Sequence, residues 1–296
     1  MAQPRITASA AVAFRAFTLI ELLVVVVILS ILGSLSLAGL NVGRQRAKID
    51  RTASTINKLN DIIIDHYESY STRLKGSNLS NLGILRATIV EEMPDSWTNV
   101  VLNPSTGPGR SYKNYKTLTA NSNYQGAECL YMIITRSGFA PGAIENFRPD
   151  EVGDADGDKM REFLDGWGHP IAFLRWAPGF STTPDGSTKY SPVQIADSVN
   201  NHDPFDVGQP APNDSTAFAM MPLIYSPGPD EDGSSSSSGY GLLTAGTTGW
   251  PLNPVALQQG ICLLQDADGK GLIGAPDPNN LNAHRDNITN HALMAR

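Results

Sequence analysis

A long uncharged stretch near the N-terminus constrains this chain more than any other feature. The 19 residues from Leu22 to Leu40 carry no charged side chain, and only serine and glycine interrupt the apolar run. A helix needs about 20 predominantly apolar residues to cross the hydrocarbon core of a bilayer. The sequence therefore predicts one membrane-spanning helix over residues 19–40.

A carboxylate, Glu21, stands at the start of this stretch. Inserting an ionised carboxylate at the centre of a membrane helix costs about 2.5 to 3.5 kcal/mol, so we expect the chain to use it. Two simpler interpretations leave Glu21 unexplained. One is a cleaved secretory signal peptide, whose apolar region is usually about 7 to 15 residues long. The other is an ordinary uncleaved anchor.

Residues 15–29, RAFTLIELLVVVVIL, resemble the N-terminal segment of type IV pilins and of the pseudopilins of type II secretion systems. The resemblance implies that a prepilin peptidase removes residues 1–16 as a leader and that the new amino group of Phe17 is methylated. It places Glu21 at the position of the family's glutamate, four residues after Phe17. Ala16 stands where the family usually has glycine before the cut.

The resemblance also implies a role for Glu21. In the family, this glutamate pairs with the N-terminus of a neighbouring subunit that is already in the filament. A low dielectric strengthens such a pair and raises the cost of leaving either charge alone. We therefore expect a single-pass protein of the inner membrane that assembles with other pilin-like subunits. Its globular domain would lie in the periplasm or in an extracellular filament.

The helical pattern continues beyond the apolar stretch. Between residues 44 and 74 the apolar side chains recur every three or four residues, which is the helical period. They are Ile49, Ala53, Ile56, Leu59, Ile63, Tyr67, Tyr70 and Leu74. We expect a helix over residues 17–76 whose second half packs on a globular domain formed by residues 77–296.

Shorter patterns describe that domain. They predict a helix around 127–134, strands at 170–176, 221–226 and 261–265, a long loop at 177–217 and a flexible tip at 233–239. The predicted fold is α+β and pilin-like, with one long helix on a small antiparallel sheet and long loops.

A short acidic motif occurs three times, as DADG at 154–157, DEDG at 230–233 and DADG at 266–269. A single motif of this kind most simply indicates a turn, because Asp and Gly dominate turns. Ca²⁺ takes 6 to 8 oxygen ligands, and alternate carboxylates followed by glycine can supply several of them. The repetition predicts Ca²⁺ as a cofactor. The candidate ligands are Asp154, Asp156, Asp158, Glu162, Asp165, Asp230, Asp232, Asp266 and Asp268.

The first acidic motif belongs to the segment with the most candidate ligands, DADGDKMREFLD at 154–165. Its five acidic residues fall at positions 1, 3, 5, 9 and 12 of a twelve-residue loop, which is the ligand spacing of an EF-hand. Two residues depart from that pattern. Lys159 occupies position 6, where glycine is usual, and Asp165 replaces the bidentate glutamate.

Two further segments, FLDGWGHPIAF at 163–173 and LIYSPGPDEDG at 223–233, resemble paired elements of the major pseudopilin of type II secretion. There a D-P-W-G-N-P entry to a strand precedes a Y-S-x-G-x-D loop that binds calcium. The resemblance implies that Asp230 and Asp232 are ligands. Gly166 and His169 depart from the usual Pro and Asn.

Other functional classes find little support. The chain has no H-E-x-x-H, G-x-S-x-G or phosphate-loop signature, so we expect no enzyme activity. The net charge of -7 argues against nucleic-acid binding, which depends on neutralising phosphates. Cys129 and Cys262 could form one long-range disulfide or remain two buried thiols.

The predicted function is a structural subunit of a type II secretion pseudopilus or a type IV pilus-like filament. The alternative is a monomeric, membrane-anchored binding domain that shares only the export signal with that family. A substitution of Glu21 would separate the two, because only the filament subunit needs this side chain for assembly.

Overall fold

The computed structural model describes residues 18–74, 82–100, 104–115, 124–178, 180–182, 188–190, 220–230 and 287–294. The chain divides into two compact units, Met1–Arg46 and Ala47–Arg296. The leader expected at residues 1–16 lies outside the described residues, and the predicted domain boundaries stay a prediction.

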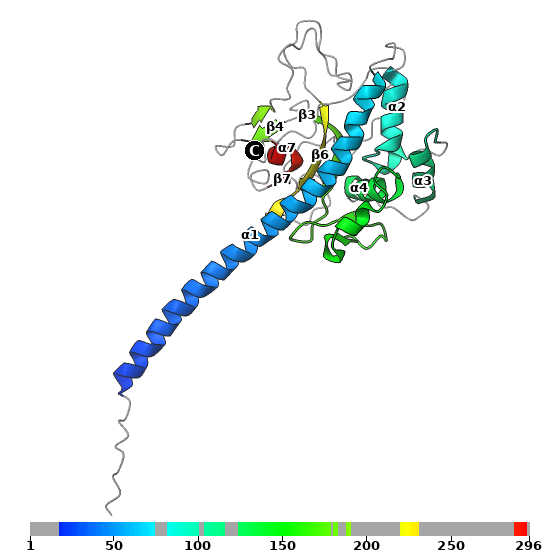
Figure 1. The fold of residues 1–296 in the computed structure, drawn as a ribbon. Helices are drawn as coiled ribbons and strands as arrows, with labels where there is room; N and C mark the ends of the chain where they lie inside the picture. The colour runs from blue at the N-terminus through cyan, green and yellow to red at the C-terminus, as the bar shows by residue number, and fades with distance from the viewer. Residues whose placement is uncertain are drawn as a thin grey trace, which may run out of the picture. The chain divides into compact units, whose positions relative to one another are not determined.

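Helix α1 (Leu19–Leu74) is 56 residues long and contributes to both units (Figure 1). Its apolar first part is long enough to cross a membrane, as the sequence predicts. The serines of this part bond within the helix. The hydroxyls of Ser30, Ser34 and Ser36 donate to the carbonyls of Val26, Ile31 and Leu32 at 2.7, 2.8 and 2.8 Å. No hydroxyl of these three therefore needs water, whose absence in lipid makes an unsatisfied polar group costly.

The second part of α1 packs on the globular unit along one face. Ile56, Leu59 and Ile63 are fully buried, and Tyr67 and Tyr70 continue the same face. Ile49, the first member of the predicted apolar stripe, is 42% exposed, so that part of the prediction is wrong. The buried face begins at Thr52, where the backbone of Gly166 meets the helix.

Several short helices surround this face. They are α2 (Leu82–Glu92), the 3-10 turn η2 (Trp97–Asn99), α3 (Gly107–Tyr115), α4 (Gln125–Arg136), and the 3-10 turns η3 (Ala143–Asn146) and η4 (Pro149–Glu151). Helix α4 coincides with the helix expected around 127–134. It buries Leu130, Met132 and Ile133 in the same core as α1.

The central sheet has the strand order β3-β6-β7 and is antiparallel throughout. Its strands are β3 (Ala172–Pro178), β6 (Met220–Ser226) and β7 (Ile288–Thr289). Strands β3 and β6 coincide with two of the predicted strands, and the third, 261–265, lies outside the described residues. The register of β3 against β6 shifts opposite Pro222, whose missing N–H cannot join the ladder.

Two smaller antiparallel pairs complete the strands. Strand β1 (Val152–Gly153) pairs with β2 (Glu162–Phe163), and β4 (Phe180–Thr182) pairs with β5 (Thr188–Tyr190). The prediction of a continuous loop over 177–217 is wrong at β4 and β5. The sequence Pro184-Asp185-Gly186 between them is a turn signal that favours a hairpin.

Helix α7 (Asn290–Met294) ties the end of the chain into the fold and is drawn in red beside β6 and β7 in Figure 1. The Asn290 amide Nδ2 donates to Asn60 Oδ1 on α1 and to the carbonyl of Pro222, both at 2.9 Å. Its Oδ1 accepts from the N–H of Ile224 at 2.9 Å. One buried side chain thus joins α1, β6 and α7, and the predicted α+β architecture is confirmed.

Candidate filament and metal sites

The start of α1 is a capping box built by Thr18 and Glu21. The backbone N–H and the hydroxyl of Thr18 both donate to Glu21 Oε2, at 2.9 and 2.7 Å, and the N–H of Glu21 donates to Thr18 Oγ1 at 3.3 Å. This reciprocal pattern satisfies N–H groups that have no partner within the first turn of a helix. The T-x-x-E sequence is the signature of a capping box, whereas the charge of Glu21 alone does not indicate one.

The cap leaves Glu21 able to bind a second group. A carboxylate offers about four acceptor sites, and Thr18 uses the oxygen Oε2. Cleavage between Ala16 and Phe17 would leave Thr18 and both of its donors in the chain. The same carboxylate can therefore cap its own helix and accept a cationic amino group.

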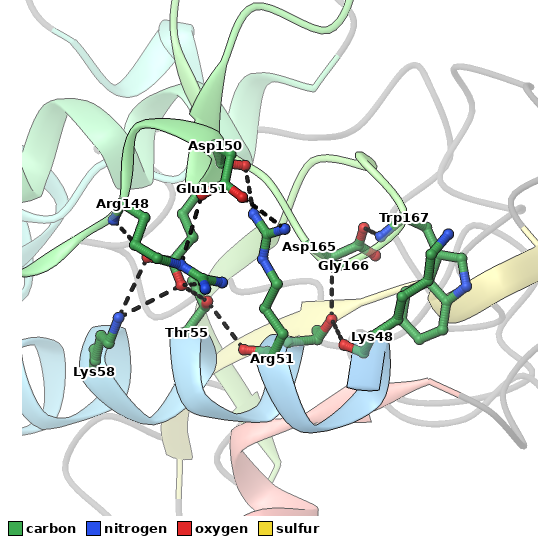
Figure 2. A network of polar contacts seen from close by, with 11 residues as sticks. Lys48, Arg51, Thr55, Lys58, Arg148, Asp150, Glu151, Asp165, Gly166 and Trp167 are labelled. Atoms are coloured by element: carbon green, nitrogen blue, oxygen red, sulfur yellow. Dashed lines mark hydrogen bonds and ion pairs between the residues drawn. The ribbon is translucent and has the colours of Figure 1, made fainter. Parts of the chain in front are cut away.

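A network of polar contacts joins α1 to the turn η4 (Figure 2). Arg51 pairs with Asp150 at 2.9 Å, Thr55 Oγ1 donates to Glu151 Oε1 at 2.7 Å, and Lys58 Nζ lies 3.3 Å from Glu151 Oε2. Asp150 is exposed, so its pair with Arg51 contributes little. Glu151 is buried, and the network centres on its carboxylate.

The electrostatics of Glu151 agree with this arrangement. Burial raises the pKa of its carboxyl, but hydrogen bonds from the Arg148 backbone, Thr55 and Lys58 outweigh that effect and hold the pKa below its usual value. The ionised form is therefore the stable one, and it fixes α1 against η4.

Gly166 allows the domain to approach the backbone of α1. A Cβ at this position would lie 2.5 Å from the carbonyl oxygen of Lys48, closer than any real contact. The N–H of Gly166 donates to Thr52 Oγ1 at 2.8 Å, and that hydroxyl donates to Lys48 O at 2.9 Å (Figure 2). Proline could neither donate this bond nor fit, which explains the departure from the family's usual Pro.

The two segments that resemble the major pseudopilin lie together in the fold. Asp165, buried, accepts from the N–H groups of Trp167 and His169 at 2.8 and 2.9 Å and from Ser226 Oγ at 2.6 Å. His169 Nδ1 lies 2.9 Å from the carbonyl oxygen of Gly228. Asp165 thus joins the two segments through hydrogen bonds.

Four carboxylates converge at a second place in the globular unit. Glu128, Asp156, Asp158 and Glu162 each offer an oxygen within 4.8 Å of the others. Glu128 comes from α4, Asp156 and Asp158 from the loop between β1 and β2, and Glu162 from the start of β2. We call this group the acidic cluster. Three of its members are predicted ligands. Sequence analysis missed Glu128, although an acidic residue between Ala127 and Cys129 on an apolar helix is the signal that could have revealed it.

The two glutamates of the cluster are fully buried. Glu128 Oε2 accepts from Trp97 Nε1, and Glu162 Oε2 accepts from the N–H of Ala155 at 3.0 Å. The other oxygen of each, Oε1, is also buried and accepts no hydrogen bond from any residue in the described ranges. Each glutamate of the cluster therefore has one buried acceptor oxygen that no described residue satisfies.

The charge of the cluster is correspondingly unfavourable without a cation. Burial and, to a smaller extent, the neighbouring carboxylates of Asp156 and Asp158 raise the pKa of both Glu128 and Glu162 to about 8, against the hydrogen bonds from Trp97 and Ala155. A positive ion would remove this repulsion and satisfy the two buried oxygens. The acidic cluster could therefore hold a metal ion.

Asp154 shapes the loop that carries the cluster. Its Oδ1 accepts from the N–H of Gly157 at 2.7 Å and its Oδ2 from the N–H of Lys159 at 3.0 Å. Gly157 and Lys159 have positive φ angles of 79° and 77°. Lys159 thus adopts, at position 6 of the loop, the left-handed backbone conformation for which glycine is usual.

The remaining predicted sites are not all described. Of Asp230, only the backbone is described, as the last residue of the 3-10 turn η5 (Gly228–Asp230). Asp232, Asp266, Asp268, Ala16 and Phe17 lie outside the described residues. Cys129 is buried in α4, whereas Cys262 lies outside these ranges, so the disulfide stays a prediction.

Comparisons with known proteins bear on the N-terminus. The family model of the prokaryotic N-terminal methylation motif matches residues 13–37. No curated protein and no solved structure matches the chain. The motif indicates a pilin-like structural protein rather than an enzyme family, and together with the apolar helix it is consistent with an inner-membrane anchor. This chain carries the prepilin signal of the type IV pilins and pseudopilins.

Proposed function

We propose that this protein is a structural subunit of a pilin-like filament, either a type II secretion pseudopilus or a type IV pilus. A prepilin peptidase cuts it between Ala16 and Phe17, and the new N-terminus is methylated. The match of the methylation motif to residues 13–37 carries this proposal.

The exposed apolar surface of α1 supports this proposal. The apolar side chains between Leu19 and Val42 are exposed on the isolated chain. Such a surface needs lipid or neighbouring helices to cover it. Lipid covers it before assembly and the helices of other subunits cover it in the filament.

The pseudopilus is the better supported of the two filaments. Two segments of this chain resemble the paired elements of its major subunit, and they meet through Asp165 with Ser226 and through His169 with Gly228. The two segments flank the paired strands β3 and β6, and their contact agrees with the resemblance.

The globular unit, in this proposal, binds Ca²⁺ in its acidic loops. The loop at 154–165 supplies carboxylate oxygens, which are the ligands that hard cations prefer. Asp230 with Asp232 and Asp266 with Asp268 are further candidate ligands. Such sites would stabilise a domain that carries long loops.

A pair of substitutions tests the filament proposal. Glu21→Ala removes both the cap and the charge. Thr18→Ala removes the hydroxyl of the cap but keeps the backbone N–H donor and the charge of Glu21. In membranes that contain the partner subunits, we expect Glu21→Ala to abolish incorporation into filaments and Thr18→Ala to retain most of it. Both variants should be exported, as protease accessibility of the globular unit would show.

Two results would contradict the proposal. Equal loss of assembly in both variants would mean that Glu21 acts only as a helix cap. Unchanged assembly, or a wild-type protein that never leaves the monomeric state, would favour the membrane-anchored binding domain.

A further inference from the structure

The acidic cluster draws its oxygens from two segments that are distant in sequence. Glu128 lies in the first turn of α4, whereas Asp156 and Asp158 lie in the loop between β1 and β2 and Glu162 lies at the start of β2. An EF-hand takes its ligands from one continuous loop of twelve residues. Here a helix elsewhere in the domain supplies an oxygen.

Asp154 explains why the loop alone is incomplete. At position 1 of an EF-hand it would be a ligand, but in this structure both of its oxygens accept backbone N–H groups, those of Gly157 and Lys159. Glu128 offers the carboxylate that the first position does not bring into the cluster.

The buried glutamates point to a ligand independently of the clustering. Each has one oxygen fixed by a donor, Trp97 Nε1 for Glu128 and the N–H of Ala155 for Glu162. Each has a second oxygen that is buried and accepts no hydrogen bond from the described residues. Leaving a buried acceptor unsatisfied is unfavourable, and more so when the acceptor is charged. Fixing one oxygen while leaving the other open is how an outer partner orients a metal ligand.

We propose that one Ca²⁺ ion binds between Glu128, Asp156, Asp158 and Glu162 and clamps helix α4 to the loop between β1 and β2. The site contains only carboxylate oxygens, which excludes the nitrogen and sulfur ligands that favour zinc. Asp156 and Asp158 are half-buried, so waters can complete the 6 to 8 oxygens that Ca²⁺ requires. Mg²⁺ demands a stricter octahedron at shorter distances, which four carboxylates from two segments fit less well.

The clamp connects the ion to the packing of the domain. Helix α4 lies in the core with α1, and β2, which begins with Glu162, continues from the loop that carries Asp156 and Asp158. Binding of Ca²⁺ thus fixes a tertiary contact, and its energy becomes folding energy. This inference rests on the calcium part of the proposed function and is independent of filament assembly.

Calcium titration of the full-length protein in detergent micelles tests the clamp. We expect wild type to bind Ca²⁺ in isothermal titration calorimetry and Glu128→Gln to bind it at least tenfold more weakly. Removing a residue that only supports a metal ligand already weakens affinity by about tenfold or more. Glu145→Gln removes an exposed carboxylate of η3 and serves as the matched control, with unchanged affinity. Ca²⁺ should raise the melting temperature of wild type and Glu145→Gln, and much less that of Glu128→Gln.

A second variant guards against misfolding of Glu128→Gln. Asp158→Asn changes a half-buried residue of the same cluster, and we expect it to weaken Ca²⁺ binding while its melting temperature in chelator matches that of wild type. Equal affinity of wild type and Glu128→Gln would overturn the clamp and leave calcium in the loops. Absence of Ca²⁺ binding by wild type at millimolar concentration would overturn both, whereas the Thr18 and Glu21 variants still decide the filament proposal.

Discussion

Single residues explain where this chain departs from the sequence patterns that it resembles, the pseudopilin segment at Gly166 and the EF-hand loop at Lys159. Gly166 replaces the family's usual Pro because the carbonyl of Lys48 occupies the space of any side chain and because its N–H bonds to Thr52. Lys159 takes a glycine's conformation because its N–H bonds to Asp154. Both departures therefore have local physical causes.

Gly166→Ala should destabilise the globular unit. The added Cβ would meet helix backbone, which cannot move aside as a flexible side chain can. Overpacking of this kind typically costs about 1 to 3 kcal/mol. Thermal unfolding in detergent micelles should show a lower melting temperature.

Gly107→Ala is the matched control for that change. Gly107 begins α3, and a Cβ there would meet nothing within 4 Å. We expect this variant to melt at or slightly above the wild-type temperature. If Gly166→Ala had the same melting temperature as Gly107→Ala, the close approach to α1 would not contribute to stability.

The longer elements follow from the sequence, and the shorter ones do not. The helical period predicts α1 and α4, and apolar runs between Gly and Pro predict β3 and β6. Strand β7 and helix α7 are only two and five residues long, so no periodicity can develop in them. Contacts with β6 and α1 fix these short elements instead.

The candidate site divides in the same way. The spacing of the loop identifies Asp156, Asp158 and Glu162 as members of one group. It cannot identify Glu128, because proximity across the fold is a tertiary property. Nor can it show that Asp154 would bond to backbone N–H groups, since spacing alone does not fix side-chain direction.

Helix α7 should make stability depend on pH through His291. Burial lowers the pKa of His291 to about 4, although its hydrogen bond to the carbonyl of Pro222 opposes that shift. The unfolded chain takes up this proton near pH 6.5 and the folded chain only near pH 4. Stability is therefore present above pH 6.5 and lost as the pH falls toward 4, by roughly 3 kcal/mol at 1.36 kcal/mol per pH unit.

His291→Gln tests this dependence because glutamine keeps an N–H donor for Pro222. We expect the melting temperature of wild type to fall more steeply than that of the variant between pH 6.5 and 4. Above pH 7 the difference between the two proteins should be constant. If the melting temperatures of the two proteins ran parallel over the whole pH range, His291 would not be buried in its neutral form.

At the scale of the whole molecule, the two units have different requirements. The first unit exposes an apolar helix that carries the prepilin signal, and an apolar surface of this kind needs lipid or neighbouring helices to cover it. The second unit has its own core, a buried carboxylate that anchors α1, and an acidic cluster that is unfavourable without a cation. In the proposed function, lipid or other subunits cover the first unit and a cation fills the acidic cluster of the second.

The central claim is that this chain is a processed subunit of a pilin-like filament. Mass spectrometry of the mature protein, purified from the membranes of its native host, tests it most directly. The account predicts an N-terminal peptide that begins at Phe17 and carries a methyl group on its amino nitrogen. An N-terminus near Gly39, or an intact leader ending in Ala16 and still joined to Phe17, would contradict it.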